Sequence, residues 1–395
     1  MEALMPRQVR RPASVKCNAK HLGRGGAGRL CCQSDKAMDE HCYAVIMAGG
    51  RGTRFWPRSR RRCAKQVLKV FGERSLIQQT VDRLRPLAPA ERVWVITNED
   101  LRAEIVRQLP EVPARQVVAE PAQRNTAPCI GLAAHILKSL DPQAVMGVFP
   151  ADQLIGNPRA FQRLVRAAYR AARQGRLVVM GIRPRWPETG YGYIEFGEDF
   201  QPDALKPAVV LRFREKPDLK TARRYVSEGR FYWNSGIFFW RADVFLEELR
   251  RHLGRTASVL AALPGFNQRG FAARLRQAYP LCENISVDYA VLEKSRNVVG
   301  FPSDAIQWND VGSWNAVYEL LPHDGQGNAV RGQALLESST GNYVDSEGKL
   351  TALLGVNNLV VVDTPDALLV ADRSYAQKVG DIVKALERQK RQDLL

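Results

Sequence analysis

The chain has 395 residues, of which 45% are hydrophobic and 25% charged, and this globular composition excludes a disordered or fibrous protein. Its formal net charge of +17 favours anionic partners such as nucleotides, phosphosugars, nucleic acid or an anionic membrane surface. No segment approaches the roughly 18 uninterrupted apolar residues of a membrane span, so we expect no membrane partner.

The positive charge is concentrated in two segments. Residues 1–37 carry eight Lys or Arg and two acidic residues, and residues 51–65 carry seven Lys or Arg and no acidic residue. This distribution argues against a general nucleic-acid coat, and we predict no specific nucleic-acid partner. The seven cysteines form no Cys-x-x-Cys pair, which favours reduced thiols and a cytoplasmic location.

Residues 1–37 show no apolar periodicity and no apolar core like that of a secretory signal. Their high arginine content leaves a transit peptide open as an alternative. We expect the natural start at Met38, directly before a strand-like run, so that residues 1–37 form a basic, disordered extension.

From residue 42 the pattern alternates apolar strands with amphipathic helices. The pattern predicts strands over 42–47, 93–97, 117–119, 144–149 and 177–182, and helices over 75–85, 99–108, 126–140 and 158–174. This order indicates an α/β domain over residues 38–330, with a Rossmann-like, mostly parallel mixed sheet covered on both faces. In such sheets ligands bind beyond the carboxyl ends of the strands.

After about residue 330 turn signals separate short β-rich runs, of which 359–362 and 367–370 form the clearest pair. An amphipathic helix is predicted over 375–391. We therefore expect residues 331–395 to form a small β-rich appendage with a terminal helix. Self-association through this region, giving a homodimer, is one hypothesis.

A glycine-rich segment, Ala48-Gly49-Gly50-Arg51-Gly52-Thr53-Arg54, follows the first strand. Glycine lets backbone N–H groups wrap around phosphate oxygens. The segment is not a Walker loop, because no Gly-Lys-Ser/Thr follows, and it lacks the third glycine of a dinucleotide fingerprint. With the basic run that continues to Lys65 it would suit a triphosphate, although a tight strand-exit turn explains the segment equally well when it is taken alone.

Eight segments in the same order resemble the sugar nucleotidyltransferase family, and within it the guanylyltransferases that make GDP-mannose. The resemblance covers about residues 42–375. The matching segments are 49–66, 120–128, 150–153, 188–195, 215–217, 233–238, 283–289 and 308–314.

The resemblance implies transfer of GMP from GTP to mannose 1-phosphate by in-line attack on the α-phosphorus, so that catalysis consists of positioning and charge neutralisation. The resemblance assigns Arg54 and Lys65 as the catalytic cations and Asp152 and Asp310 as the Mg²⁺ ligands. It assigns nucleotide binding to Gly49, Gly50, Gly52, Arg124, Asn125 and Thr126. It assigns sugar-phosphate binding to Gly190, Glu195, Lys216 and Asn234.

Simpler structural explanations exist for several of these residues. Asn125 and Asp310 could each serve only as a helix N-cap, and Lys216 could lie in a surface turn. Five arginines of the basic run lack a firm family match, and most of them are expected to be solvated or guiding charges: Arg51, Arg58, Arg60, Arg61 and Arg62.

Three alternative functions stay open. The chain could be a related nucleotidyltransferase with a different nucleotide or hexose 1-phosphate, a non-catalytic regulatory homologue, or a nucleic-acid binder. Longer family members carry a metal-binding isomerase domain, but only His323 lies beyond residue 300, so we expect no isomerase activity.

Overall fold

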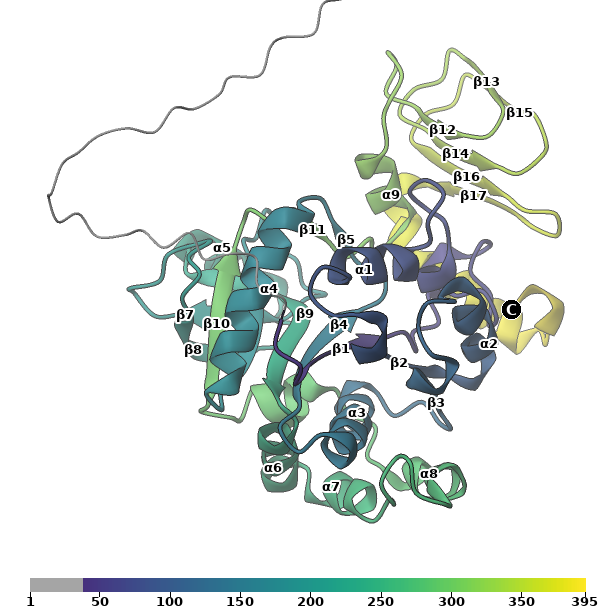
Figure 1. The fold of residues 1–395 in the computed structure, drawn as a ribbon. Coiled ribbons are helices and arrows are strands. Elements are labelled where there is room, and N and C mark those ends of the chain that lie inside the picture. The colour runs from purple at the N-terminus through teal and green to yellow at the C-terminus, as the bar shows by residue number, and fades with distance from the viewer. Residues whose placement is uncertain (1–37) are drawn as a thin grey trace, which may run out of the picture. The chain divides into compact units, whose positions relative to one another are not determined.

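The computed structural model describes residues 38–395, and the predicted extension over 1–37 lies outside the described residues. The described part contains a large mixed sheet with helices on both faces, followed by short strands and a helix (Figure 1). The prediction of an α/β fold with a β-rich C-terminal region and a terminal helix is confirmed.

The large sheet has the strand order β3-β2-β1-β4-β9-β6-β10-β8-β7. Strands β3, β2, β1 and β4 pair in parallel, and β9 lies antiparallel between β4 and β6. The strands are β1 (Cys42–Met47), β2 (Val93–Asn98), β3 (Val117–Glu120), β4 (Val145–Pro150), β6 (Leu177–Ile182), β7 (Tyr193–Phe196), β8 (Ala208–Arg214), β9 (Phe231–Arg241) and β10 (Val298–Ser303).

Two groups of helices bury the two faces of this sheet. One group consists of α1 (Leu76–Leu84), α2 (Glu99–Gln108), α4 (Pro158–Arg173) and α5 (Leu219–Glu228). The other consists of α3 (Thr126–Leu140), α6 (Ala242–His252), α7 (Gly254–Ala261), α8 (Phe271–Ala278) and a π-helical turn over Asp288–Leu292. Because both faces are covered, the central strands are apolar over most of their length, as the sequence pattern predicted.

Local sequence signals set where these helices begin. Ser75 caps α1 in a capping box with Gln78, and Asn157 precedes Pro158 at the start of α4. Asn125 caps α3 from a backbone conformation with positive φ, 65°. This cap places the first turn of α3 beside the carboxyl end of β3.

The C-terminal region stacks short strands in two sets that are parallel except for β17, which runs antiparallel to β16. One sheet has the order β12-β14-β16-β17, and β13 pairs in parallel with β15. The elements are β12 (Ala329–Arg331), β13 (Ala334–Glu337), β14 (Tyr343–Ser346), β15 (Thr351–Leu354), β16 (Leu359–Asp363), β17 (Leu368–Asp372) and α10 (Val379–Arg388). The terminal helix begins later than predicted, because Arg373–Lys378 forms a 3-10 helix before it.

A third apolar core joins the C-terminal region to the basic loop after β1. It contains Phe55 and Trp56 from the loop, Trp314 from α9 (Trp314–Leu320), Tyr343 from β14 and Val379 from α10. The Phe55 and Trp314 rings lie 5.0 Å apart, and the Trp314 indole donates to the Trp56 carbonyl at 3.0 Å. The loop is therefore packed between two parts of the chain. One further short pair, β5 (Leu154–Ile155) with β11 (Trp308–Asn309), adjoins it.

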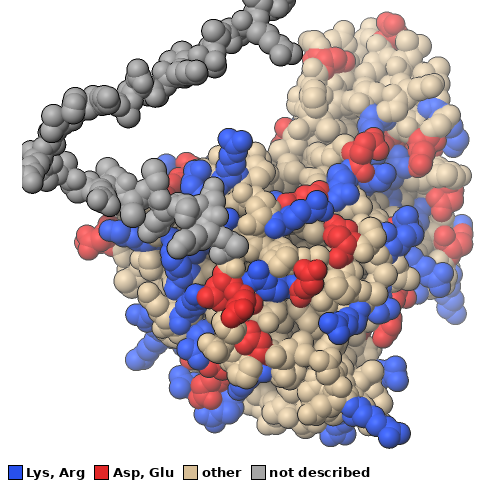
Figure 2. All heavy atoms as spheres, in the orientation of Figure 1, with Lys and Arg blue, Asp and Glu red and all other residues tan. Residues whose placement is uncertain are grey.

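The surface in Figure 2 shows Lys and Arg interspersed with Asp and Glu on the face in view. Among residues 38–395 no helix is long and apolar enough to cross a membrane. The four cysteines of this part, Cys42, Cys63, Cys129 and Cys282, are all free thiols.

Candidate active site

Two adjoining cavities lie at the carboxyl ends of β1, β3 and β4, where the sheet topology predicts a ligand site. The larger cavity has a volume of about 800 Å³ and the smaller about 410 Å³. Asp152, Asn234 and Gly236 line both cavities. A ligand in one cavity would therefore meet a ligand in the other near Asp152.

The glycine-rich loop forms one wall of the larger cavity. Gln66 fastens this loop, because its amide nitrogen donates to the carbonyls of Ala48 at 2.6 Å and Gly50 at 3.1 Å. Gly52 has φ of 62°, and a Cβ there would lie 2.6 Å from the Lys65 Cβ, so this position requires glycine. All six predicted nucleotide-binding residues line this cavity: Gly49, Gly50, Gly52, Arg124, Asn125 and Thr126.

Glu120 closes strand β3 and lines the larger cavity together with Gln123 and Thr126. The Tyr279 hydroxyl donates a hydrogen bond to Oε1 of Glu120. Burial raises the pKa of the Glu120 carboxyl to about 7. Its other oxygen, Oε2, lies 3.2 Å from the Cβ position of Gly49 and thus under the glycine-rich loop. A half-buried carboxylate with one oxygen fixed suits a ligand that offers hydrogen-bond donors.

The smaller cavity contains both predicted catalytic cations and both predicted metal ligands. Lys65 is buried, and its ammonium group donates to Oδ2 of Asp152 at 2.8 Å and to the Asp310 carbonyl at 2.6 Å. The pKa of the Asp310 carboxyl is raised by burial and by the charge of Asp152, against the lowering effect of the Tyr191 hydrogen bond. That bond, from the Tyr191 hydroxyl to Asp310 Oδ1, is 2.5 Å long.

Asp152 and Asp310 fit a divalent cation that also binds phosphate. They lie near enough for the charge of one to raise the pKa of the other, and both line the smaller cavity. No group of three or more His, Cys, Asp or Glu side chains that could hold a metal occurs within residues 38–395. Two carboxylates are nevertheless the usual protein contribution to a Mg²⁺ site that is completed by phosphate and water.

The predicted sugar-phosphate residues divide into two pairs. Gly190 and Asn234 line the smaller cavity, and the Asn234 amide donates to Asp288 Oδ1 at 2.9 Å. Lys216 lies next to this cavity, with its ammonium 2.8 Å from Glu215 Oε1, but it is not part of the lining.

The structure does not bring Glu195 to either cavity. It is buried within the sheet, and its oxygens pair with Arg230 at 2.9 Å and Arg212 at 3.3 Å. The carboxylate that lines the smaller cavity is Glu215, in the loop directly after β8. Glu215 Oε2 is buried without a hydrogen-bond partner, so it has an acceptor left for a ligand.

Several cavity residues received no role from the sequence. Glu120, Glu215 and Asp288 lie in segments that resemble the family. The resemblance could therefore have indicated these three residues, but no role was assigned to them. Burial raises the pKa of Asp288 to about 7, and the charge of Glu215 adds to this effect. Gln377 lines the smaller cavity from the C-terminal region, and no sequence pattern indicated it.

The expectation of solvated charges in the basic run is wrong for three arginines. Arg51 pairs with Glu387 at 2.7 Å, Arg58 with Asp345 at 2.7 Å and Arg60 with Asp366 at 3.0 Å. All three partners come from residues 345–387. The C-terminal region therefore neutralises much of the charge that the loop carries.

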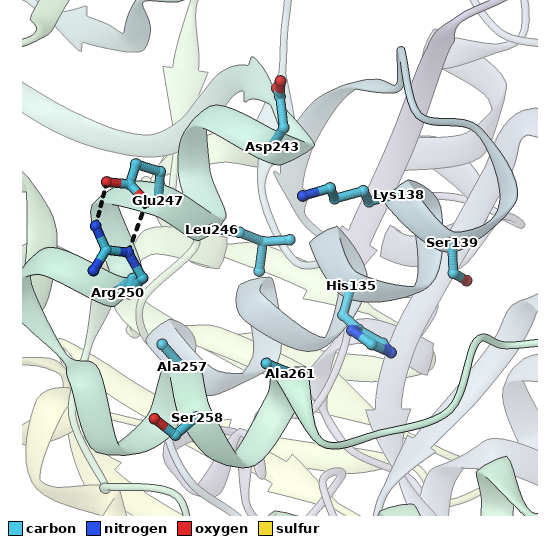
Figure 3. A pocket seen from close by; sticks show the side chains of 10 residues that line it. All are labelled: His135, Lys138, Ser139, Asp243, Leu246, Glu247, Arg250, Ala257, Ser258 and Ala261. Atoms are coloured by element: carbon cyan, nitrogen blue, oxygen red, sulfur yellow. Dashed lines mark hydrogen bonds and ion pairs between the residues drawn. The ribbon is translucent and has the colours of Figure 1, made fainter.

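A further hollow of about 570 Å³ lies between α3, α6 and α7, on the outside of one helical layer (Figure 3). It contains none of the predicted site residues, and its Glu247 and Arg250 pair with each other at 2.8 Å. We therefore place the site at the two adjoining cavities of the sheet edge.

Comparison with known proteins identifies relatives over most of the chain. A sequence model described as nucleotidyl transferase matches residues 43–327, and one described as the MannoseP isomerase/GMP-like beta-helix domain matches residues 334–386. Mannose-1-phosphate guanylyltransferase of Escherichia coli is 42% identical over 352 residues, covering 88% of this chain and 74% of that protein. The protein of the same name from Klebsiella pneumoniae is 41% identical over 354 residues, with the same coverage.

A crystal structure from Thermus thermophilus, titled mannose-1-phosphate geranyltransferase, superposes with a TM-score of 0.78 at 33% sequence identity. The superposition covers 88% of this chain and 99% of that chain. The likeness therefore extends over both the large sheet and most of the C-terminal region.

Proposed function

The chain belongs to the nucleotidyl transferase family, and we propose that it transfers GMP from GTP to mannose 1-phosphate, forming GDP-mannose and pyrophosphate. Its close relatives are guanylyltransferases, and its substrates are accordingly a nucleotide and a sugar phosphate. The following assignments of residues to that reaction are our own proposal.

The observation that carries the assignment is the junction of the two cavities at Asp152. In-line transfer requires the sugar phosphate oxygen to lie directly against the α-phosphorus, opposite the leaving pyrophosphate. A nucleotide in the larger cavity and a sugar phosphate in the smaller cavity would meet at this junction. Holding both reactants in this way supplies much of the rate enhancement that such a reaction needs.

The larger cavity suits a guanine nucleotide. If the α-phosphorus lies at Asp152, the base lies at the opposite end, where Glu120 provides the carboxylate. Guanine offers N1–H and the 2-amino group side by side, which match the two oxygens of a carboxylate. Adenine offers an acceptor at N1, which the Glu120 carboxylate would repel. We therefore assign Glu120 to guanine recognition, with Arg124, Asn125 and Thr126 around it.

The glycine-rich loop and two cations are assigned to the triphosphate. Backbone N–H groups of Gly49, Gly50 and Gly52 approach phosphate oxygens, and Arg54 and Lys65 stabilise the charge that develops at the α-phosphorus. Lys65 is fixed between Asp152 and the Asp310 carbonyl, so it needs little reorganisation when the substrate arrives. Its burial strengthens its interaction with phosphate.

A divalent cation, which we propose is Mg²⁺, would be held by Asp152 and Asp310. When bound, the cation neutralises negative charge on the phosphate oxygens. Tyr191 contributes by fixing one oxygen of Asp310, which leaves the other oxygen for the ion.

The smaller cavity is assigned to mannose 1-phosphate. Glu215 has a free buried acceptor for a sugar hydroxyl, and Asn234 is held by Asp288 with its amide in the cavity. Gly190 leaves room for the sugar ring, and Lys216 lies beside Glu215, where it can reach the sugar's phosphate. Glu215 replaces Glu195 in this role, because the oxygens of Glu195 are already paired with arginines.

The test is pyrophosphate release from GTP, ATP, UTP or dTTP with mannose 1-phosphate and Mg²⁺. We expect release with GTP, its loss in Asp152→Ala, and its retention in the control Asp199→Ala, which changes an exposed aspartate away from both cavities. Release with another nucleotide would refute the assignment of guanine. No release with any nucleotide would favour a different hexose 1-phosphate or a regulatory homologue.

We also propose that the protein forms a homodimer through its C-terminal region and that it is cytoplasmic. Exposed apolar side chains on its short strands, among them Leu354, Leu368 and Val370, support self-association. Sedimentation of the full chain tests the dimer, and a monomer at micromolar concentration would refute it.

A further inference from the structure

The C-terminal region contacts the basic loop through charged pairs and through one neutral amide. Arg51, Arg58 and Arg60 each pair with a carboxylate of residues 345–387. Arg54 instead donates from its guanidinium to the amide oxygen of Gln377, at 2.7 Å. The partner of the proposed catalytic arginine therefore differs in charge from the partners of its three neighbours.

Gln377 and Arg54 meet at the smaller cavity, which both residues line. Gln377 lies in the 3-10 helix Arg373–Lys378, directly before α10. The next turn packs against the loop, because a Cβ at Gly380 would lie 3.3 Å from Thr53 Oγ1 and 3.9 Å from Arg54 Cγ. This close packing sets the position of Gln377 relative to Arg54.

The guanidinium nitrogen that donates to Gln377, Arg54 Nη1, also lies close to the segment that carries Asp310. It is 3.5 Å from the Cβ position of Gly312, which is itself 3.0 Å from Asp310 Oδ2. The bond to Gln377 thus holds this end of the guanidinium near the proposed metal ligand. Rotation of the Arg54 side chain away from the cavity would break the bond to Gln377.

We propose that Gln377 is a positioning residue, which holds the Arg54 guanidinium toward the reacting phosphates without neutralising its charge. This proposal rests on the proposed function, because it takes Arg54 to act on the triphosphate. An amide oxygen accepts one N–H and leaves the positive charge of the guanidinium available to phosphate. A carboxylate at this position would form an ion pair with Arg54 and compete with the phosphate oxygens.

The consequence is that residues 43–327, the part that matches the nucleotidyl transferase family, do not contain the whole site. One side chain that lines the smaller cavity comes from the region that matches the beta-helix description, residues 334–386. The three ion pairs and the core around Trp314 and Tyr343 keep that region in place.

Two substitutions at this position separate positioning from charge. Gln377→Ala removes the bond, and Gln377→Glu keeps the shape but adds a negative charge. The control Gln389→Glu makes the same change at the exposed end of α10, away from the cavity. Each variant is made in the full chain and in an Arg54→Ala background. Affinity for GTP with Mg²⁺ is measured by calorimetry, and kcat and KM by pyrophosphate release.

We expect Gln377→Ala to lower kcat/KM about 5- to 10-fold and Gln377→Glu to weaken GTP binding about 10-fold or more. In the Arg54→Ala background Gln377→Ala should alter GTP affinity by less than about twofold, because Gln377 acts through Arg54. Gln389→Glu should behave as the wild-type chain.

Unchanged kinetics and affinity in both Gln377 variants would overturn the proposal. Equal losses from Gln377→Ala with and without Arg54 would also overturn it, since they would indicate a merely structural role. A failure of the proposed function would be distinguishable, because the wild-type chain itself would then release no pyrophosphate from GTP and mannose 1-phosphate. A wild-type chain that also fails to bind GTP would overturn both.

Discussion

Replacing Glu120 with glutamine tests directly whether this carboxylate selects guanine. The substitution preserves size and keeps one oxygen to accept the Tyr279 hydrogen bond. It replaces the other carboxylate oxygen with an NH₂ group. This hydrogen-bond donor would then lie against the 2-amino group of guanine, which is also a donor. Xanthine has an oxygen where guanine has its 2-amino group, so the glutamine variant should prefer XTP.

The expected loss follows from the charge on Glu120. A hydrogen bond to a charged group contributes about 1.5 to 3 kcal/mol, and the opposed donors add to this loss. Since about 1.4 kcal/mol corresponds to tenfold, we expect kcat/KM for GTP to fall roughly 100-fold. The same variant should use XTP about tenfold better than the wild-type chain does.

The pKa of Glu120 gives a second readout. Burial raises this pKa to about 7, and guanine recognition requires the ionised form. Binding of GTP should therefore strengthen as the pH rises through 7, by about tenfold between pH 6 and pH 8. The glutamine variant should lose this dependence, because its side chain does not titrate in that range.

The assay is steady-state pyrophosphate release with GTP and with XTP, at several pH values, for the wild-type chain, Glu120→Gln and a control. Glu91→Gln is a suitable control, because Glu91 is exposed and lies outside both cavities. If Glu120→Gln kept the wild-type ratio of GTP to XTP within about twofold, the base would not face Glu120 and the proposed orientation of the nucleotide would be refuted.

Three other substitutions test the metal site, the loop anchor and a buried acid. Asp310→Asn should raise the Mg²⁺ concentration needed for half-maximal activity about tenfold or more, and an unchanged requirement would remove Asp310 from the metal site. Arg58→Ala should lower the free energy of unfolding in urea by about 2 to 4 kcal/mol, because it leaves the buried Asp345 carboxylate without its main partner. The exposed Arg61→Ala should cost less than about 0.5 kcal/mol, and equal costs would contradict the role of the Arg58 pair. Because burial raises the pKa of Asp288 from 3.8 to about 7, stability from its protonated form is present below pH 4 and is lost as the pH rises through 7. Asp288→Asn should thus raise the melting temperature relative to the wild-type chain at pH 8 and not at pH 4, and the opposite order would refute the buried-acid explanation.

The fold was accessible from sequence because its signals are local. Apolar runs end at glycine or proline, and caps such as Ser75 and Asn157 begin the helices, so most predicted boundaries differ from the structure by only one or two residues. The exception is the terminal helix, where a 3-10 turn and an α-helix share one amphipathic pattern. Over so short a segment, the periodicity of apolar residues does not distinguish a 3-10 helix from an α-helix.

The site was less accessible because its contacts are distant in sequence. The order of the segments shared with the family identified the glycine-rich loop, Asp152 and Asp310, which line the cavities. It did not distinguish Glu195 from Glu215. Both are glutamates on neighbouring strands or their ends, and only the pairing of Glu195 with arginines separates them. Likewise, no local pattern shows that an arginine at position 58 meets an aspartate at position 345.

The separation between the basic loop and its partners also bears on synthesis of the chain. The Trp56 indole donates to the carbonyl of a residue 338 positions later, and the acidic partners of the loop lie nearly as far along. At about 5 to 20 residues per second, ribosomes need roughly 17 to 68 s to make the intervening 338 residues. Throughout this interval the nascent chain presents a cluster of unneutralised arginines beside a polyanionic ribosome, so chaperone access and translation rate should influence the yield of active protein.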